Sequence, residues 1–236
     1  MTFSIAGRCS RTGMLGVAIT TSSIAVSARC PWVRAGVGAV STQNVTDPRL
    51  GPQGLDLLEQ GLSAPEAMAK LIANAPNKDF RQVIMVDRAG RTAHWTGANA
   101  LGRRGVFEGK DCVSGGNLLK HAGVPQAIVE GFEKNSEAAL PDRLIAALEA
   151  GLASGGEMGP VHSAGVIVVH EQIWPLVDLR VDWADDNPIA GLRKLWEAYR
   201  PQMQDYVTRA LNPSAAPSYG VPGDPGAKPP SSSRRA

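Results

Sequence analysis

The sequence predicts an α+β fold in which antiparallel sheets lie between outer layers of helices. The predicted strands occur in hairpin pairs, and the predicted helices occur in adjacent pairs between them. This order differs from the strict βαβ alternation of a doubly wound parallel sheet. Strand segments such as GVAI and GVIVV are apolar almost throughout, which is typical of sheets covered on both faces. We therefore expect two sheets stacked face to face between helices.

The first half of the chain predicts three strands followed by two helices. The apolar runs TFSIAGR and MLGVAITTS flank residues 9–13, where Gly13 can supply the positive φ of a tight hairpin connection. GVGAVSTQ follows as a third strand. Two adjacent helices are predicted from GPQGLDLLEQGL and SAPEAMAKLIANA, and in the second of these Ser63 and Glu66 have the spacing of a capping box.

The second half repeats the pattern. RQVIMVD and RTAHWTG predict a hairpin around residues 88–90, and short strands are expected near Val106 and Val113. Apolar residues at helical spacing predict a second helix pair in PQAIVEGFEKN and PDRLIAALEAGLAS. The strands SAGVIVVH and IWPLVDLRVDW come next. The last predicted helix, PIAGLRKLWEAYRPQMQDYVTRAL, should be interrupted at Pro201.

Composition limits the class of protein. The chain has 236 residues, of which 43% are hydrophobic and 19% charged, and its formal net charge of +2 does not indicate a nucleic-acid surface. No apolar stretch is long enough to cross a membrane, and the N-terminus does not read as a signal peptide, so we expect a cytoplasmic protein. Residues 213–236 change abruptly to Pro, Gly, Ser and Ala. We expect one domain over residues 1–212 and a flexible tail after it.

Several common motifs are missing from the sequence. No serine has the glycines of a nucleophile elbow, there is no Walker loop, and the four histidines have no H-E-x-x-H spacing. Cys9, Cys30 and Cys112 are widely separated and are expected to be ordinary buried thiols. We therefore expect neither a metal nor another cofactor.

Two local patterns could carry chemistry. Asp178, Arg180 and Asp182 alternate with apolar residues and share one strand face. They predict either a solvated sheet edge or subunit contact, or an arginine clamp for a substrate carboxylate. The SGGN run that ends at Asn117 predicts either a turn or a cradle of donors for an oxyanion.

Several stretches together resemble the DUF1028 family, which is assigned to the Ntn-hydrolase-like superfamily. They are TFSIAGR, LGVAITTSSIAV, ARCPWVRAGVGAVSTQNVTDPRLGPQGLDLL, FRQV, SGGNLL and VDLRVD. The resemblance implies the four-layer αββα sandwich of that superfamily. The chain departs from the family where relatives carry an acidic residue, Arg-Gly and then Gln-Ser, because it has EMGPVHS at residues 157–163.

The resemblance also implies a nucleophile at the N-terminus. In Ntn hydrolases the first residue of the mature chain attacks a carbonyl, and its own α-amine acts as the base. Removal of Met1 would give Thr2 this position. Ser4 is a rival on the same strand face, but it would require cleavage after Phe3. A third possibility is that Thr2 only begins a strand.

We therefore expect a hydrolase of a C–N bond in a small carboxylated molecule, either an amide or the enamine or imine of a deaminase. The alternative is a non-catalytic sandwich that binds a metabolite or acts in assembly. Asn117 is a candidate oxyanion donor and Arg29 a carboxylate anchor. We also expect a homo-oligomer. The substrate-binding candidates, drawn from local chemistry and from the stretches that resemble the family, are Ser22, Ser23, Arg29, Gln43, Gly116 and Arg180.

Overall fold

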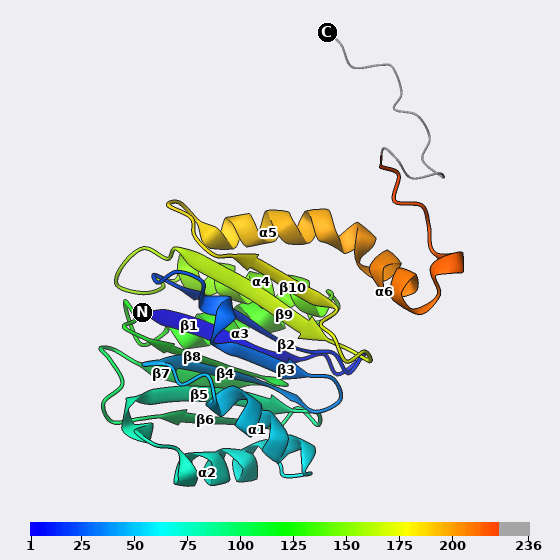
Figure 1. Ribbon diagram of the computed structural model, residues 1–236. Coiled ribbons are helices and arrows are strands. Elements are labelled where there is room, and N and C mark those ends of the chain that lie inside the picture. The colour runs from blue at the N-terminus through cyan, green and yellow to red at the C-terminus, as the bar shows by residue number, and fades with distance from the viewer. Residues whose placement is uncertain (222–236) are drawn as a thin grey trace. The chain divides into compact units, whose positions relative to one another are not determined.

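Two antiparallel sheets form the centre of the structure, a computed structural model that describes residues 1–221 (Figure 1). The larger sheet has the strand order β10-β9-β2-β1-β8-β7. Its strands, in chain order, are β1 (Thr2–Arg8), β2 (Leu15–Thr21), β7 (Gly105–Gly109), β8 (Cys112–Asn117), β9 (Ser163–Val169) and β10 (Val177–Val181). The first strand of the chain is therefore central and is paired on both sides.

The smaller sheet has the order β3-β4-β5-β6. It contains β3 (Pro31–Arg34), β4 (Gly38–Asn44), β5 (Arg81–Asp87) and β6 (Thr92–Thr96). The predicted hairpins are present, and the strand β3 was not predicted as one. The PWVR segment is short and lies at an edge of the sheet, so it has only one strand partner.

Helices cover the outer face of each sheet. α1 (Leu50–Glu59) and α2 (Ala64–Asn74) pack on the smaller sheet, and α3 (Val124–Glu133) and α4 (Leu140–Ala153) pack on the larger one. The two sheets contact each other through their inner faces. The layer order is therefore αββα, as Figure 1 shows.

Local sequence explains the first hairpin. Gly13 has a φ of 75°, a conformation that costs glycine little, and the β1 and β2 pairing then runs from Arg8 opposite Leu15 to Thr2 opposite Thr21. Alternation along β1 directs Ala6 between the sheets, into an apolar cluster with Val17 and Ile84. Burying each larger side chain of this cluster contributes about 1.5 to 3 kcal/mol.

The capping box at α2 is confirmed, because the Ser63 N–H donates to Glu66 at 2.8 Å. The last predicted helix is interrupted near Pro201, as expected. It consists of α5 (Pro188–Tyr199), a 3-10 turn at Arg200–Gln202, and α6 (Met203–Leu211).

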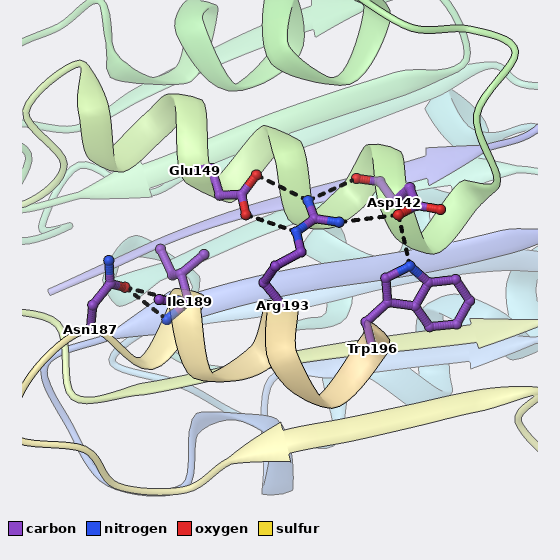
Figure 2. Close-up of polar contacts among 7 residues, drawn as sticks. Asp142, Glu149, Asn187, Ile189, Arg193 and Trp196 are labelled. Carbon is purple, nitrogen blue, oxygen red and sulfur yellow. Dashed lines mark hydrogen bonds and ion pairs between the residues drawn. The ribbon is translucent and has the colours of Figure 1, made fainter. Parts of the chain in front are cut away.

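Polar contacts join α5 to α4 (Figure 2). The Arg193 guanidinium pairs with Glu149 at 2.9 and 3.0 Å and with Asp142 at 3.1 Å. The buried Trp196 indole donates to Asp142 at 2.8 Å. At the start of the helix, the Asn187 side chain accepts from the N–H groups of residues 189 and 190, which satisfies donors that a helix leaves free.

The described part of the chain divides into two compact units, the first over Met1–Glu197 and the second beginning at Ala198. In the second unit Arg209 lies over the Tyr219 ring at 4.0 Å and donates to the Pro217 carbonyl at 3.1 Å. Residues 213–221 of the predicted tail thus include contacts to α6, and residues 222–236 lie outside the described part of the chain. The predicted domain boundary at Asn212 stays a prediction.

Candidate functional site

Two rows of polar side chains face each other between the sheets, at the end where β1 begins. On the larger sheet Thr2 is paired with Thr21 on one side and Asn117 on the other. On the smaller sheet Gln82 is paired with Gln43 and Thr96. Strand alternation places these residues on the inner faces, in positions that farther along hold the apolar cluster of Ala6 and Ile84. The interior therefore changes from apolar to polar toward this end.

Directed hydrogen bonds connect the two sheets. Ser4 donates to the Gln43 side-chain oxygen at 2.7 Å, and the Gln43 amide donates to Gln82 at 2.8 Å. Gln82 in turn donates to the Gly116 carbonyl at 3.1 Å and accepts from Asn117 at 3.3 Å. All four side chains are at most 1% exposed. A buried network of this kind fixes side-chain positions, because an unpaired member would be costly.

The glycine of the SGGN run that faces this network is Gly115. A Cβ atom there would lie 3.0 Å from Ile84 and 3.7 Å from the Gln43 amide nitrogen. A larger side chain would therefore press on the residues between the sheets. The predicted turn at this run is wrong, because the residues belong to β8 and pair with β1 and β7. The cradle hypothesis now depends on the Asn117 side-chain nitrogen, because only an N–H group can donate to an oxyanion. That nitrogen donates to Gln82 at 3.3 Å, and the side-chain oxygen is buried without a hydrogen-bond partner within residues 1–221.

Met1 lies at the end of the row of polar side chains on the larger sheet, next to Thr2 and Thr21. The Thr2 hydroxyl donates to the Met1 carbonyl at 2.6 Å and lies 3.0 Å from the Thr21 hydroxyl, which also donates to the Met1 carbonyl. Thr2 is 7% exposed with Met1 in place. Removing Met1 would free both hydroxyls of their acceptor and turn the Thr2 nitrogen into an amine.

A second string of contacts leads from Thr21 toward the surface. The Thr21 hydroxyl lies 3.3 Å from the Ser23 hydroxyl, and Arg29 donates to Ser23 at 3.2 Å. The same guanidinium donates to the carbonyls of Ile24 and Ala25 at 2.7 and 2.8 Å. Two predicted substrate-binding residues, Ser23 and Arg29, are thereby connected to the row that contains Thr2.

Glu157 adds a carboxylate near the amino terminus. The residue is 5% exposed, and neither carboxylate oxygen makes a hydrogen bond of good geometry among the described residues. Burial raises the pKa of its carboxyl to about 8, although the positive amino terminus and the Ser22 amide both act to lower that pKa.

The other predicted site residues have different surroundings. Ser22 directly follows β2 and is half-buried, and Gly116 contributes its carbonyl to Gln82. Arg180 lies on the edge strand β10, with β9 and β2 between it and β1. Its guanidinium is held by Asp178 at 3.0 and 3.2 Å, in a half-exposed pair. The structure therefore does not bring Arg180 to the polar rows.

Three residues of the site were missed from the sequence, and two of them had a signal there. In the first hairpin, the residues that pair can be counted outward from the turn, and this count pairs Thr21 with Thr2. The position of Thr21 in the row could therefore have been predicted from the sequence. Gln82 alternates with Ile84 and Val86 in RQVIMVD, which predicts an inward glutamine. Glu157 lies in a loop, where no alternation or spacing indicated its position.

Other features are described for residues 1–221 only. Three surface cavities lie away from Thr2: one over α1 and α2, one beside Arg143 and Lys110, and one between α2 and β6. No group of three or more His, Cys, Asp or Glu side chains in this part of the chain is arranged to hold a metal ion. Cys9, Cys30 and Cys112 are buried free thiols, as predicted. Within the same range, every helix is too short or too polar to cross a membrane.

The layers follow the order αββα, and the chain's first residues lie at the end of a central strand of the larger sheet, so the fold is a four-layer αββα sandwich. The chain belongs to the DUF1028 family, a family of unknown function, whose model matches residues 2–192. This finding confirms the resemblance on which the four-layer expectation was based.

A solved structure of the same family is similar to this chain. The crystal structure of a DUF1028 protein from Silicibacter pomeroyi has 28% sequence identity and a TM-score of 0.80, and the match covers 87% of this chain and 89% of that chain. Two Anbu (ancestral β-subunit) structures match at lower similarity. The one from Yersinia bercovieri has 11% identity and a TM-score of 0.38, and a mutant from Hyphomicrobium sp. strain MC1 has 14% and 0.41; each match covers 86% of this chain and 96% of that chain. No curated protein matches the sequence significantly.

Proposed function

We propose that this protein is a hydrolase of a C–N bond in a small carboxylated molecule, with Thr2 as its nucleophile after removal of Met1. The observation that carries the proposal is the position of the Thr2 hydroxyl, between Thr21 and Asn117 and in contact with the Met1 carbonyl. One peptide bond thus separates the present arrangement from a free α-amine beside its own hydroxyl.

The contacts favour Thr2 over Ser4. Ser4 is fully buried within a strand paired on both sides, and its hydroxyl donates to Gln43. Exposing its amine would require cleavage after Phe3, which is also fully buried. Thr2 requires only the removal of one terminal residue. We therefore assign Ser4 to the connection between the sheets.

The proposed reaction starts when Thr2 Oγ1 attacks the substrate carbonyl carbon. The hydroxyl proton passes to the Thr2 α-amine, which is a suitable base because an α-amine titrates near pH 8. The resulting ammonium gives this proton to the leaving nitrogen as the C–N bond breaks, and water then hydrolyses the ester on Thr2. An enamine or imine substrate of a deaminase would also lose its nitrogen by hydrolysis.

Two neighbours fit supporting roles. Asn117 is the cross-strand partner of Thr2, so its amide lies within reach of a developing oxyanion. Arg29 is connected to Thr21 through Ser23, and its half-exposed guanidinium suits a substrate carboxylate. We further propose that the enzyme acts in the cytoplasm as a homo-oligomer.

The test uses intact-mass measurement and then a β-lactone as a general acylating probe. We expect the purified chain to lack Met1 and to gain the mass of one lactone on Thr2. Thr2→Ser should still be acylated, because it keeps both the amine and a hydroxyl. Thr2→Ala should not react, although it should fold, since the change at a strand end is small.

Ser4→Ala is the matched control, because it removes the rival hydroxyl from the same strand face. It should be acylated at a rate close to that of the parent protein. A chain that retains Met1, or acylation that persists in Thr2→Ala, would refute the proposal. Retained Met1 would favour the non-catalytic alternative, a sandwich that binds a metabolite or acts in assembly.

A further inference from the structure

Glu157 has no role in the chemistry described above, yet the fold delivers it to the amino terminus. After α4 the chain turns through Gly155 and Gly156, which have φ values of 122° and 58°, and then runs beside Leu118–Lys120. The Lys120 N–H donates to the Gly156 carbonyl at 3.0 Å, and the Met158 N–H donates to the Leu118 carbonyl at 3.0 Å. This backbone pairing fixes Glu157 opposite Leu119.

The segment that contains Glu157 lies close to the first residues of the chain on two sides. Leu118–Lys120 directly follows Asn117, the cross-strand partner of Thr2. On the other side, a Cβ atom at Gly159 would lie 3.0 Å from the Met1 side chain, so the segment packs against Met1. The segment that carries Glu157 therefore lies between the strand end at Asn117 and Met1, and the amino terminus and the Ser22 amide both act on its carboxylate.

The carboxylate lacks a fixed partner in this position. It is 5% exposed, and its two oxygens make no hydrogen bond of good geometry among residues 1–221. The amino terminus is the charged group that acts on it, whereas Lys120 and His121 on the neighbouring segment are exposed to solvent. A buried carboxylate without a counter-charge is costly, and this cost is why burial raises the pKa of the Glu157 carboxyl to about 8. An ammonium group at a new terminus on Thr2 would lower that pKa and hold the carboxyl in its ionised form.

We propose that Glu157 is a positioning residue for the Thr2 α-amine, an inference that rests on the proposed function. In the chain without Met1 its carboxylate accepts hydrogen bonds from the amine and orients the nitrogen toward the Thr2 hydroxyl. When the hydroxyl proton passes to the nitrogen, the carboxylate stabilises the ammonium that forms. The proton then leaves with the substrate nitrogen, so Glu157 itself neither gains nor loses a proton.

The direct test is an NMR titration of the Thr2 α-nitrogen in chain labelled with ¹⁵N-threonine. A carboxylate beside an amine favours the ammonium form, so the parent protein should have an amine pKa at least about one unit above that of Glu157→Gln. Glu157→Asp keeps the charge on a shorter side chain and should give an intermediate pKa. It also allows the comparison if Glu157→Gln fails to fold. Glu130→Gln, an exposed change on α3, should leave the amine pKa unchanged.

β-Lactone acylation provides the second readout. In Glu157→Gln the maximum rate should fall about tenfold, since the amine is no longer oriented, and the acid limb of the pH profile should move to lower pH with the amine pKa. If the amine pKa is the same in the parent protein and in Glu157→Gln, the inference is wrong. The Glu157 carboxylate would then be a candidate to bind a cationic group of the substrate. If the amine pKa differs between the two proteins as expected but the parent protein is not acylated, the proposed function is refuted, and the interaction of Glu157 with the Thr2 amine stands.

Discussion

Replacing Gln82 by leucine should destabilise the protein although the two side chains are similar in size. Gln82 is fully buried. Besides the part-buried Thr96 hydroxyl and Gly105 carbonyl, three buried groups depend on it: the Gln43 amide at 2.8 Å, the Asn117 amide at 3.3 Å and the Gly116 carbonyl at 3.1 Å. Leaving each unsatisfied costs about 1 to 2 kcal/mol. The apolar side chain gained on substitution offsets about 1 to 2 kcal/mol of that sum.

The expected net loss is therefore about 3 kcal/mol in the free energy of unfolding, or roughly 6 to 12 °C in Tm for a domain of this size. Urea denaturation followed by tryptophan fluorescence measures it, and the midpoint should fall without a change in slope. Gln53→Leu, on the exposed surface of α1, is the control and should change stability by less than about 0.5 kcal/mol. If Gln82→Leu is as stable as this control, the polar rows do not support the fold in the way argued.

Other outcomes can be checked in the same protein. Asn117→Ala should lower the rate of Thr2 acylation about 100-fold if the amide donates to the oxyanion; an unchanged rate would restrict Asn117 to its contact with Gln82. Burial acts to raise the pKa of Asp87, but hydrogen bonds from residues 64, 89 and 91 outweigh it and hold that pKa below its usual value. The stability that Asp87 contributes should thus be complete above about pH 5 and lost as the pH falls through its lowered pKa. The gap between the urea midpoints of the parent and Asp87→Asn should begin to narrow below about pH 4 and close only below that lowered pKa; a gap that does not narrow as the pH falls would contradict this assignment. A chain ending at Asn212 should keep its Tm within a few degrees, as scanning calorimetry would show, because the removed residues are poor in apolar side chains; a large fall would mean that they pack on the fold.

Most of the fold could be predicted because its signals are local. Alternation in TFSIAGR and MLGVAITTS, with Gly13 between them, defines a hairpin and its register. Ser63 and Glu66 mark the start of α2 for the same reason, since the capping box involves only neighbours. The PWVR strand was missed, because its strand character depends on a partner that approaches from another part of the chain.

The site could be predicted only where a local pattern pointed to it. Thr2 is conspicuous at the start of an apolar strand. Gln43 and Gln82 are neighbours on the smaller sheet, and their contacts with Ser4 and Asn117 arise because the larger sheet stacks on it, which no spacing in the sequence indicates. Ser4 illustrates the difference. As a serine on the same strand face as Thr2, it was a candidate nucleophile. The structure shows that its hydroxyl already donates to Gln43. Glu157 depends in the same way on backbone pairing across a long loop.

The contact of the Met1 carbonyl with the Thr2 and Thr21 hydroxyls has a practical consequence for protein production. Under the proposed function, an affinity tag fused ahead of Met1 would keep a peptide bond on the Thr2 nitrogen and would give a well-folded but inert preparation. Screening such material against candidate substrates would return false negatives. A tag at the other terminus, together with a host whose methionine aminopeptidase keeps pace with expression, would deliver the processed chain.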